Sequence, residues 1–195
     1  MSKRAQRVHD NRAYMLHATA WRETSLIVQS FSREHGCIAL VAKGAKRPYS
    51  VLRPVLSAFQ PLLMSWSGGG EVKTLIRAEV AGVHPLGGAA LMSAWYMNEL
   101  LLRLLPREDA HPLLFDAYET ALQQLAGGTR AAGALRRFEW VLLRETGYGV
   151  DEREPDFSDP RIEPELRREL RERLEMHLVG RPLSTRRVLM DLQRL

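Results

Sequence analysis

The pattern of apolar and polar residues changes near residue 84. Before that point, short runs rich in β-branched and apolar residues are separated by glycine, proline or polar clusters, which is typical of β-strands joined by turns. After it, apolar residues recur at intervals of three and four, which is typical of helices. The stretch His84-Pro85-Leu86-Gly87-Gly88 separates the two patterns. We therefore predict two domains, over residues 1–83 and 84–195.

The first domain is predicted to contain five strands. We expect them over residues 12–19, 24–31, 37–43, 59–66 and 71–83, after a disordered basic tail of residues 1–11. Five short strands without a long helix between them favour a small closed barrel, because closure removes exposed sheet edges. Such a barrel is compatible with an OB-fold.

The second domain is predicted to be all helical, so the fold class is α+β, with an N-terminal five-stranded OB-fold barrel and a helical C-terminal domain. We expect helices over residues 89–105, from 112 to the Gly127-Gly128 pair, and over 131–146, 163–178 and 184–195. Pro106 ends the first helix and Pro112 opens the second, because proline lacks a donor and fixes φ. Glu99 lies at the edge of the first helix's apolar face, where a buried carboxylate needs a polar partner.

Charge adds a functional indication to this picture. The net charge is +5, but residues 1–83 carry 12 basic and 5 acidic residues, whereas residues 84–195 carry 16 and 18. Positive charge concentrated in one half favours an anionic partner such as nucleic acid for that half. No apolar run is long enough to span a membrane, and we expect a cytoplasmic protein without membrane contact.

The positive charge is densest where the third strand ends. Lys43, Lys46 and Arg47 follow an apolar run, and Gly44 and Pro48 stand among them, so the chain should pass from strand to turn to loop. Three cations at the end of a strand form a site suited to phosphate groups. The alternative interpretation is a solvated loop without a ligand.

The sequence offers little for catalysis. The single Cys37 can form neither an internal disulfide nor a cysteine zinc site. The six histidines lack metal-ligand spacing, and no serine lies in a nucleophile elbow. The acidic residues between Tyr148 and Pro160 lack EF-hand spacing, which favours a solvated linker. We therefore predict a non-enzymatic protein with no catalytic residue, no cofactor and no metal.

Short motifs occur in a specific order along nearly the whole chain. They are Leu16-His17, Glu23-Thr24-Ser25-Leu26, Val41-Ala42-Lys43-Gly44-Ala45, Gly70-Glu71-Val72-Lys73-Thr74-Leu75, Asn98-Glu99-Leu100-Leu101, Ala134-Leu135-Arg136-Arg137-Phe138-Glu139, Gly147-Tyr148-Gly149 and Gly180-Arg181-Pro182-Leu183. With these motifs the chain resembles the RecO family of bacterial recombination-mediator and DNA-repair proteins.

The resemblance implies an OB-fold domain, a helical domain that binds partner proteins, and a nucleoid-associated role in DNA repair and recombination after DNA damage. It implies binding to single- and double-stranded DNA, single-strand annealing, and work with RecR and with the single-stranded DNA-binding protein, SSB. In the family, the helical domain holds SSB's acidic C-terminal tail, which ends in Phe, and the family arginine falls on Arg136. Without the resemblance, an ion pair between Arg136 and Glu139 is the simpler interpretation.

The resemblance also directs the prediction of a DNA site. We expect DNA phosphates to bind the cations on the basic side of the barrel, which are Lys43, Lys46, Arg47, Arg53, Lys73 and Arg77. Tyr14, Trp21, Tyr49 or Trp66 could stack on bases, although aromatic residues of small barrels more often belong to the core. An OB-fold RNA-binding protein is the alternative, because its charge and fold would look alike.

The chain departs from the family in one respect. Many relatives carry an additional segment, often with zinc-binding cysteines, after the Gly-Tyr-Gly motif. This chain passes from Tyr148-Gly149 through a short acidic connector to its last helices. We therefore expect a short form that binds no zinc and lacks any contact that relatives make through that segment.

Overall fold

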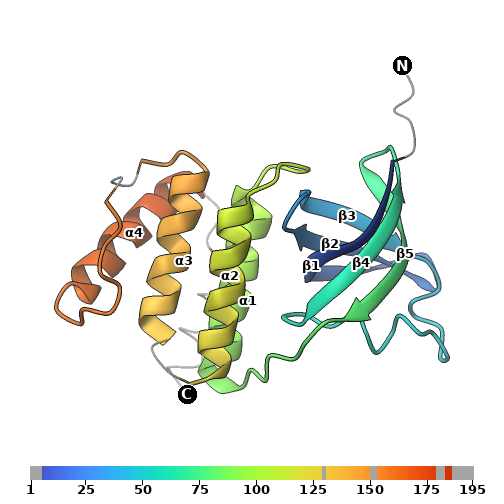
Figure 1. Ribbon diagram of the computed structural model, residues 1–195, viewed down its shortest axis with the longest axis horizontal. Helices are drawn as coiled ribbons and strands as arrows, with labels where there is room; N and C mark the ends of the chain where they lie inside the picture. The colour runs from blue at the N-terminus through green and yellow to red at the C-terminus, as the bar shows by residue number, and fades with distance from the viewer. Residues whose placement is uncertain (1–5, 129–130, 150–152, 179–182, 186–195) are drawn as a thin grey trace. The chain divides into compact units, whose positions relative to one another are not determined.

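The computed structural model describes residues 6–128, 131–149, 153–178 and 183–185. Its N-terminal strands form a closed barrel in the order β1-β2-β3-β5-β4 (Figure 1). The strands are β1 (Gln6–Trp21), β2 (Ser25–Ser32), β3 (Gly36–Ala42), β4 (Pro61–Gly68) and β5 (Val72–Val80). β1 pairs antiparallel with both β2 and β4, and β3 pairs parallel with β5. This arrangement confirms the predicted five-stranded OB-fold barrel.

The first strand is longer than predicted. β1 begins at Gln6, so the part of the predicted tail that the structure describes belongs to the sheet. Two register shifts divide this strand, between Val8 and Asn11 against β4 and between Met15 and His17 against β2. Such irregularities increase the local twist, which lets one long strand pair with neighbours on both sides of a barrel.

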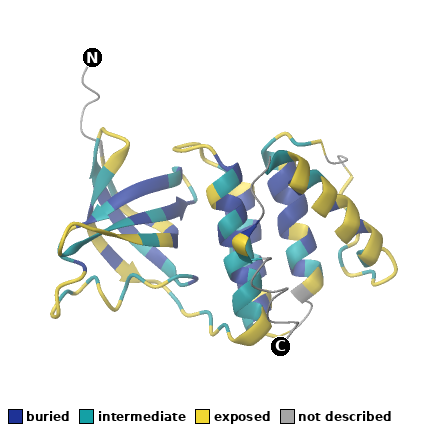
Figure 2. Ribbon diagram, turned by 180° about the vertical axis from the view of Figure 1, so that it is seen from behind, coloured by how far each residue is buried: buried dark blue, intermediate teal, exposed yellow. Residues whose placement is uncertain are grey.

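The barrel core takes its side chains from all five strands, whose inner faces are buried (Figure 2). Leu40 and Trp66 of this core are almost completely excluded from solvent, and Tyr14 and Phe31, which lie outside this cluster, are equally buried. The hydroxyl of Tyr14 lies 3.3 Å from Nε2 of His84, which gives its polar end a partner. Two of the aromatic residues considered for base stacking, Tyr14 and Trp66, are therefore buried structural residues, which is the interpretation that the sequence analysis favoured for aromatic residues of a small barrel.

The C-terminal part of the described chain is helical, as predicted. Its helices are α1 (Gly88–Leu104), α2 (Pro112–Ala126), α3 (Ala131–Glu145) and α4 (Glu163–His177). Their buried faces contain Phe115, Tyr118 and Phe138. The hydroxyl of Tyr118 donates a 2.6 Å hydrogen bond to the buried amide oxygen of Asn98, so this polar pair is satisfied inside the core. The last predicted helix, 184–195, lies outside the described residues except for its first two positions.

The chain forms two compact units, and the first unit includes a short segment from within the helical half of the sequence. The segment Pro106–His111, between α1 and α2, groups with the barrel rather than with the helices. Its Glu108 amide donates a 2.9 Å hydrogen bond to the carbonyl of Cys37. Gly36 has a φ of +65°, and a Cβ there would come within 1.8 Å of the Asp109 carbonyl oxygen, so only glycine permits this approach.

The single thiol of the chain, Cys37, lies where the segment Pro106–His111 contacts the barrel. Desolvation raises the pKa of Cys37 to about 12, which leaves it protonated and unreactive at neutral pH. None of the helices within the described ranges is long and apolar enough to cross a membrane.

Candidate functional site

The loop after β3 is held firmly at its base. We call residues 43–53 the basic loop. The amide of Lys46 donates a 2.8 Å hydrogen bond to the carbonyl of Thr24, and that of Arg47 donates a 3.0 Å bond to Gly44. Gly44 has a φ of +70°, and Ala45 is buried in the barrel core. The loop is therefore built from hydrogen-bonded turns that fix where its cations stand.

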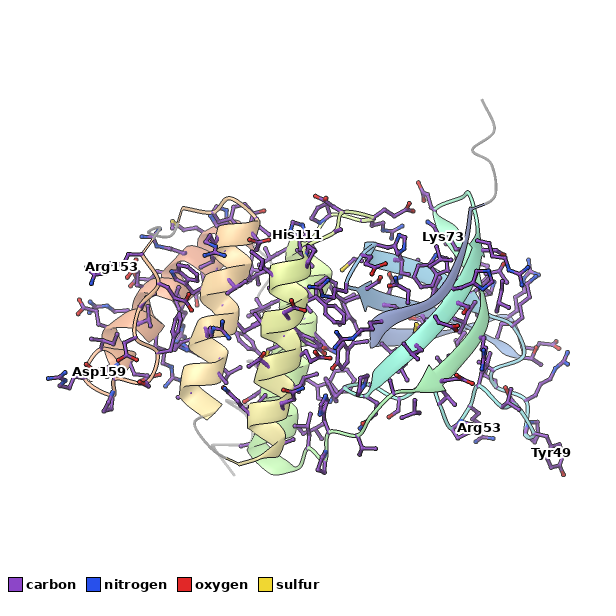
Figure 3. The ribbon with its side chains drawn as sticks, in the orientation of Figure 1. Tyr49, Arg53, Lys73, His111, Arg153 and Asp159 are labelled. Atoms are coloured by element: carbon purple, nitrogen blue, oxygen red, sulfur yellow. The ribbon has the colours of Figure 1, made fainter. Side chains whose placement is uncertain are left out.

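Four of the six predicted phosphate-binding cations lie on this loop. Lys43, Lys46, Arg47 and Arg53 are all exposed, and within the described part of the chain none of them has a carboxylate partner. Figure 3 shows Arg53 extending from the loop into solvent. These charges are therefore available to an anionic ligand without first breaking an ion pair.

The other two predicted cations have carboxylate partners. Lys73, on β5, is ion-paired with Glu108 of the segment that covers the barrel. Arg77, also on β5, pairs with Glu79 and lies 3.9 Å from an Asp10 carboxylate oxygen. A phosphate would have to compete with these carboxylates, so we expect Lys73 and Arg77 to contribute less than the loop cations.

A hollow of about 670 Å³ lies beside the basic loop. It is lined by Trp21 at the end of β1, by Arg22 and the carboxylate of Glu23 from the turn that follows, and by Lys43 and Arg47 from the basic loop. Trp21 is 45% exposed, and the guanidinium carbon of Arg22 lies 6.0 Å from the centre of its ring. We call this feature the Trp21 hollow. An exposed aromatic face among cations suits a base joined to a phosphate.

The sequence analysis did not select Arg22. In the sequence, Arg22 stands out only as the neighbour of Trp21 in a predicted connection between strands. That position does not show that the connection lies beside the end of the third strand. The pairing of Leu26 with Ala42 in the sheet creates this proximity. Of the four aromatic residues considered for stacking, Trp21 and Tyr49 remain exposed.

The predicted partner-binding residue lies on α3. Arg136 is buried, and its Nη2 lies 3.1 Å from Oε1 of Glu139, so the simpler ion-pair interpretation is also realised. The Tyr96 hydroxyl donates a 2.7 Å hydrogen bond to the same oxygen. Burial raises the pKa of Glu139, and the Arg136 charge opposes that effect. Nε of Arg136 and Oε2 of Glu139 have no hydrogen-bond partner among the described residues.

A pocket of about 240 Å³ opens onto this ion pair. We call it the Arg136 pocket. Its apolar lining comes from Leu135, Leu174, Leu178 and Leu183, and its cations are Arg136, Arg167 and Arg171. An apolar interior bordered by arginines suits a hydrophobic residue that carries a carboxylate, because guanidinium groups bind carboxylates with charge-assisted hydrogen bonds.

One wall of this pocket is held by Glu99 of α1. Its carboxylate accepts hydrogen bonds from the Ser184 amide at 2.8 Å and from the Thr185 amide and hydroxyl at 2.9 and 2.7 Å. Burial raises the pKa of Glu99, but these bonds and the Arg103 charge outweigh it, and the net result is a lowered pKa. The sequence analysis expected a polar partner for Glu99, and Ser184 and Thr185 provide it. They directly follow Leu183, which lines the pocket.

Comparison with known families matches both halves of the chain. Residues 7–84 match the family described as Recombination protein O N terminal, and residues 87–155 match Recombination protein O C terminal.

Individual relatives extend this result. A protein of Aromatoleum aromaticum named DNA repair protein RecO is 63% identical over 146 residues, which cover 74% of this chain but 61% of the relative. A protein of the same name from Ralstonia nicotianae is 45% identical over 235 residues, covering 97% of this chain and 86% of the relative. The second alignment is longer than this 195-residue chain, so that relative contains residues without a counterpart here.

Proposed function

Because this chain belongs to the RecO family, we propose that it is a non-enzymatic recombination mediator in DNA repair. It binds single- and double-stranded DNA, anneals complementary single strands, and helps to load recombinase onto SSB-coated single-stranded DNA with RecR. The barrel domain, residues 1–83, holds the DNA, and the helical domain, residues 84–195, holds partner proteins. The observation that carries this proposal is a group of four exposed cations on one loop of an OB-fold barrel, none of which has a carboxylate partner among the described residues.

The positive charge of the basic loop is sufficient to promote annealing by electrostatics alone. When Lys43, Lys46, Arg47 and Arg53 neutralise phosphates, condensed counterions are released and binding gains free energy. Neutralising phosphates also lowers the repulsion between two strands, which allows complementary bases to meet. No bond is made or broken in this process, so no catalytic group is required.

The Trp21 hollow adds contacts to bases. Stacking of a base on an aromatic ring contributes about 1–3 kcal/mol and tolerates any base. Arg22 and Arg47 line this hollow and would hold the adjoining phosphates while Trp21 takes the base. A single strand satisfies this arrangement, because its bases can turn outward.

The Arg136 pocket is the proposed site for the SSB tail. The terminal Phe would enter the apolar interior formed by Leu135 and Leu174, and its carboxylate would bind Arg136. Arg167 borders the same pocket and would attract the acidic residues before the Phe, whereas Arg171 is paired at 3.2 Å with Glu175, which also lines the pocket, and would contribute less. Holding SSB in this way would tether its DNA to the protein that carries the basic loop.

The proposal is tested by annealing complementary strands coated with SSB. We expect the wild-type protein to accelerate annealing, and the Lys43→Ala/Lys46→Ala/Arg47→Ala variant to lose most of that acceleration while remaining folded. A wild-type protein that leaves the rate unchanged would contradict the proposal. Running the same assay with RNA strands separates it from the RNA-binding alternative, for which RNA would be the better substrate.

A further inference from the structure

The end of the basic loop exposes two apolar side chains. Tyr49 is 99% exposed and Val51 is 82% exposed. Figure 3 shows Tyr49 projecting from the loop into solvent, away from the strands of the barrel. Single exposed apolar residues are common on protein surfaces, but apolar side chains grouped at one place can mark an interaction site.

The loop is built so that these side chains stay exposed. The amide of Ser50 donates a 3.1 Å hydrogen bond to the Arg47 carbonyl, and that of Arg53 donates a 3.2 Å bond to the Ser50 carbonyl. Ala45 before these side chains is buried in the barrel core, and Leu52 and Val55 after them pack against it. Both sides are therefore anchored to the barrel, and Tyr49 and Val51 stand exposed between the anchors.

The sequence on either side of these side chains is entirely cationic or neutral, although Glu23 of a neighbouring turn lines the same hollow as Arg47. Exposed Arg47 precedes them and exposed Arg53 follows them, and no acidic residue occurs in the sequence between Glu34 and Glu71. This charge is complementary to a polyanion and unfavourable for a basic protein surface. Some DNA-binding proteins insert apolar side chains between stacked bases while neighbouring cations bind the phosphates.

We propose that Tyr49 and Val51 form a wedge that enters DNA where a duplex ends in unpaired strands. This inference rests on the proposed function, in which the basic loop binds DNA. Entering a fully paired stack requires unstacking two base pairs, whereas at the end of a duplex one side of the step is already free. Arg47 and Arg53, on either side of the wedge, hold the phosphates of the two separating strands. Such a junction is the point at which annealing strands add their next base pair.

The first test compares binding to three DNA forms of one sequence by fluorescence anisotropy. They are a single strand, a blunt duplex and a duplex with two unpaired arms. We expect wild-type protein to prefer the armed duplex over the blunt one by about tenfold, the effect of one stacked ring. Tyr49→Ala should lower this ratio severalfold, to what single-strand contacts such as the Trp21 hollow provide, and Tyr49→Phe should keep it. A ratio that Tyr49→Ala leaves unchanged would overturn the wedge.

The second test follows the junction base itself, replaced by fluorescent 2-aminopurine. Binding of wild-type protein should brighten it by unstacking, and Val51→Ser should reduce that change. The matched control is Val83→Ser, because Val83 is also exposed but lies outside the basic loop. Equal brightening with all three proteins would contradict the inference.

These outcomes separate the wedge from the proposed function. A protein that binds every DNA form, with no preference for the armed duplex, lacks the wedge but keeps its DNA-binding role. A protein that binds none of them loses both. Binding of wild-type protein to vesicles of anionic lipid that Tyr49→Ala abolishes, with DNA binding unaffected, would assign the end of the loop to a membrane surface and overturn the wedge.

Discussion

At the scale of single residues, the ambiguous position is Arg136. Its buried guanidinium already has one carboxylate, from Glu139, yet its Nε has no partner among the described residues. A buried donor without a partner costs free energy that a ligand's oxygen could recover. Because the same arginine lines an apolar pocket, the ion pair and a partner-binding role are compatible rather than exclusive.

This argument predicts how Arg136 variants bind a peptide with the sequence of the SSB tail. Arg136→Ala should weaken binding by about 1.5–3 kcal/mol, the range for hydrogen bonds to charged groups, as measured by calorimetry. Since that change also leaves Glu139 buried without its cation, Glu139→Gln is the matched control. It keeps Arg136 and removes the competing carboxylate, so binding should be equal or tighter. Equal affinity for wild type and Arg136→Ala would end the assignment.

At the scale of elements, the clearest long-range contact joins α1 to the segment after α4. Glu99 and Thr185 are 86 positions apart in sequence, and the Glu99 carboxylate accepts hydrogen bonds from the backbone amides of Ser184 and Thr185, directly after Leu183. A carboxylate that accepts backbone amides in this way acts as an N-cap side chain does, although it comes from a different element.

Replacing this cap should loosen the segment specifically. Glu99→Gln should lower stability by about 1–2 kcal/mol, the usual range for losing an N-cap. It should also speed hydrogen exchange at the Thr185 amide. The control is Glu169→Gln, which removes an exposed ion pair with Arg173 and should cost less than about 1 kcal/mol. Unchanged exchange at Thr185 in the Glu99→Gln variant would show that the cap contributes nothing.

The same cap has a defined pH dependence. Because the folded state lowers the pKa of Glu99, its contribution is present above the pKa of the unfolded chain and is lost as pH falls through the lowered value. Acidification should therefore release the segment in wild type and have little further effect on Thr185 exchange in the Glu99→Gln variant.

Sequence patterns predicted these elements well and their contacts poorly. The periods of two and of three to four identified the five strands and four described helices, because each period reflects one buried face. Nothing local indicated that Glu108, 35 positions away, would pair with Lys73. The same holds for Arg22, which reaches the Trp21 hollow only because β2 and β3 pair.

At the scale of the whole molecule, the distribution of charge agrees with the proposal that the barrel domain binds DNA and the helical domain binds partner proteins. The barrel domain carries the excess of cations, and its basic loop presents them without carboxylate partners in the described chain. The sequence predicted this asymmetry because net charge is a sum over residues. It could not tell the available cations from the paired ones, which depends on where distant carboxylates fold.

The central claim, that the unpaired cations of the basic loop bind DNA phosphates, is tested most directly by the salt dependence of single-strand binding. A plot of log affinity against log salt concentration should be steep for wild type and flatter by about two for Lys43→Ala/Lys46→Ala/Arg47→Ala, since each lost phosphate contact removes about 0.7. The matched control, Lys73→Ala/Arg77→Ala, should change the slope by less, because those cations already have carboxylates. An unchanged slope for the loop variant would contradict the account.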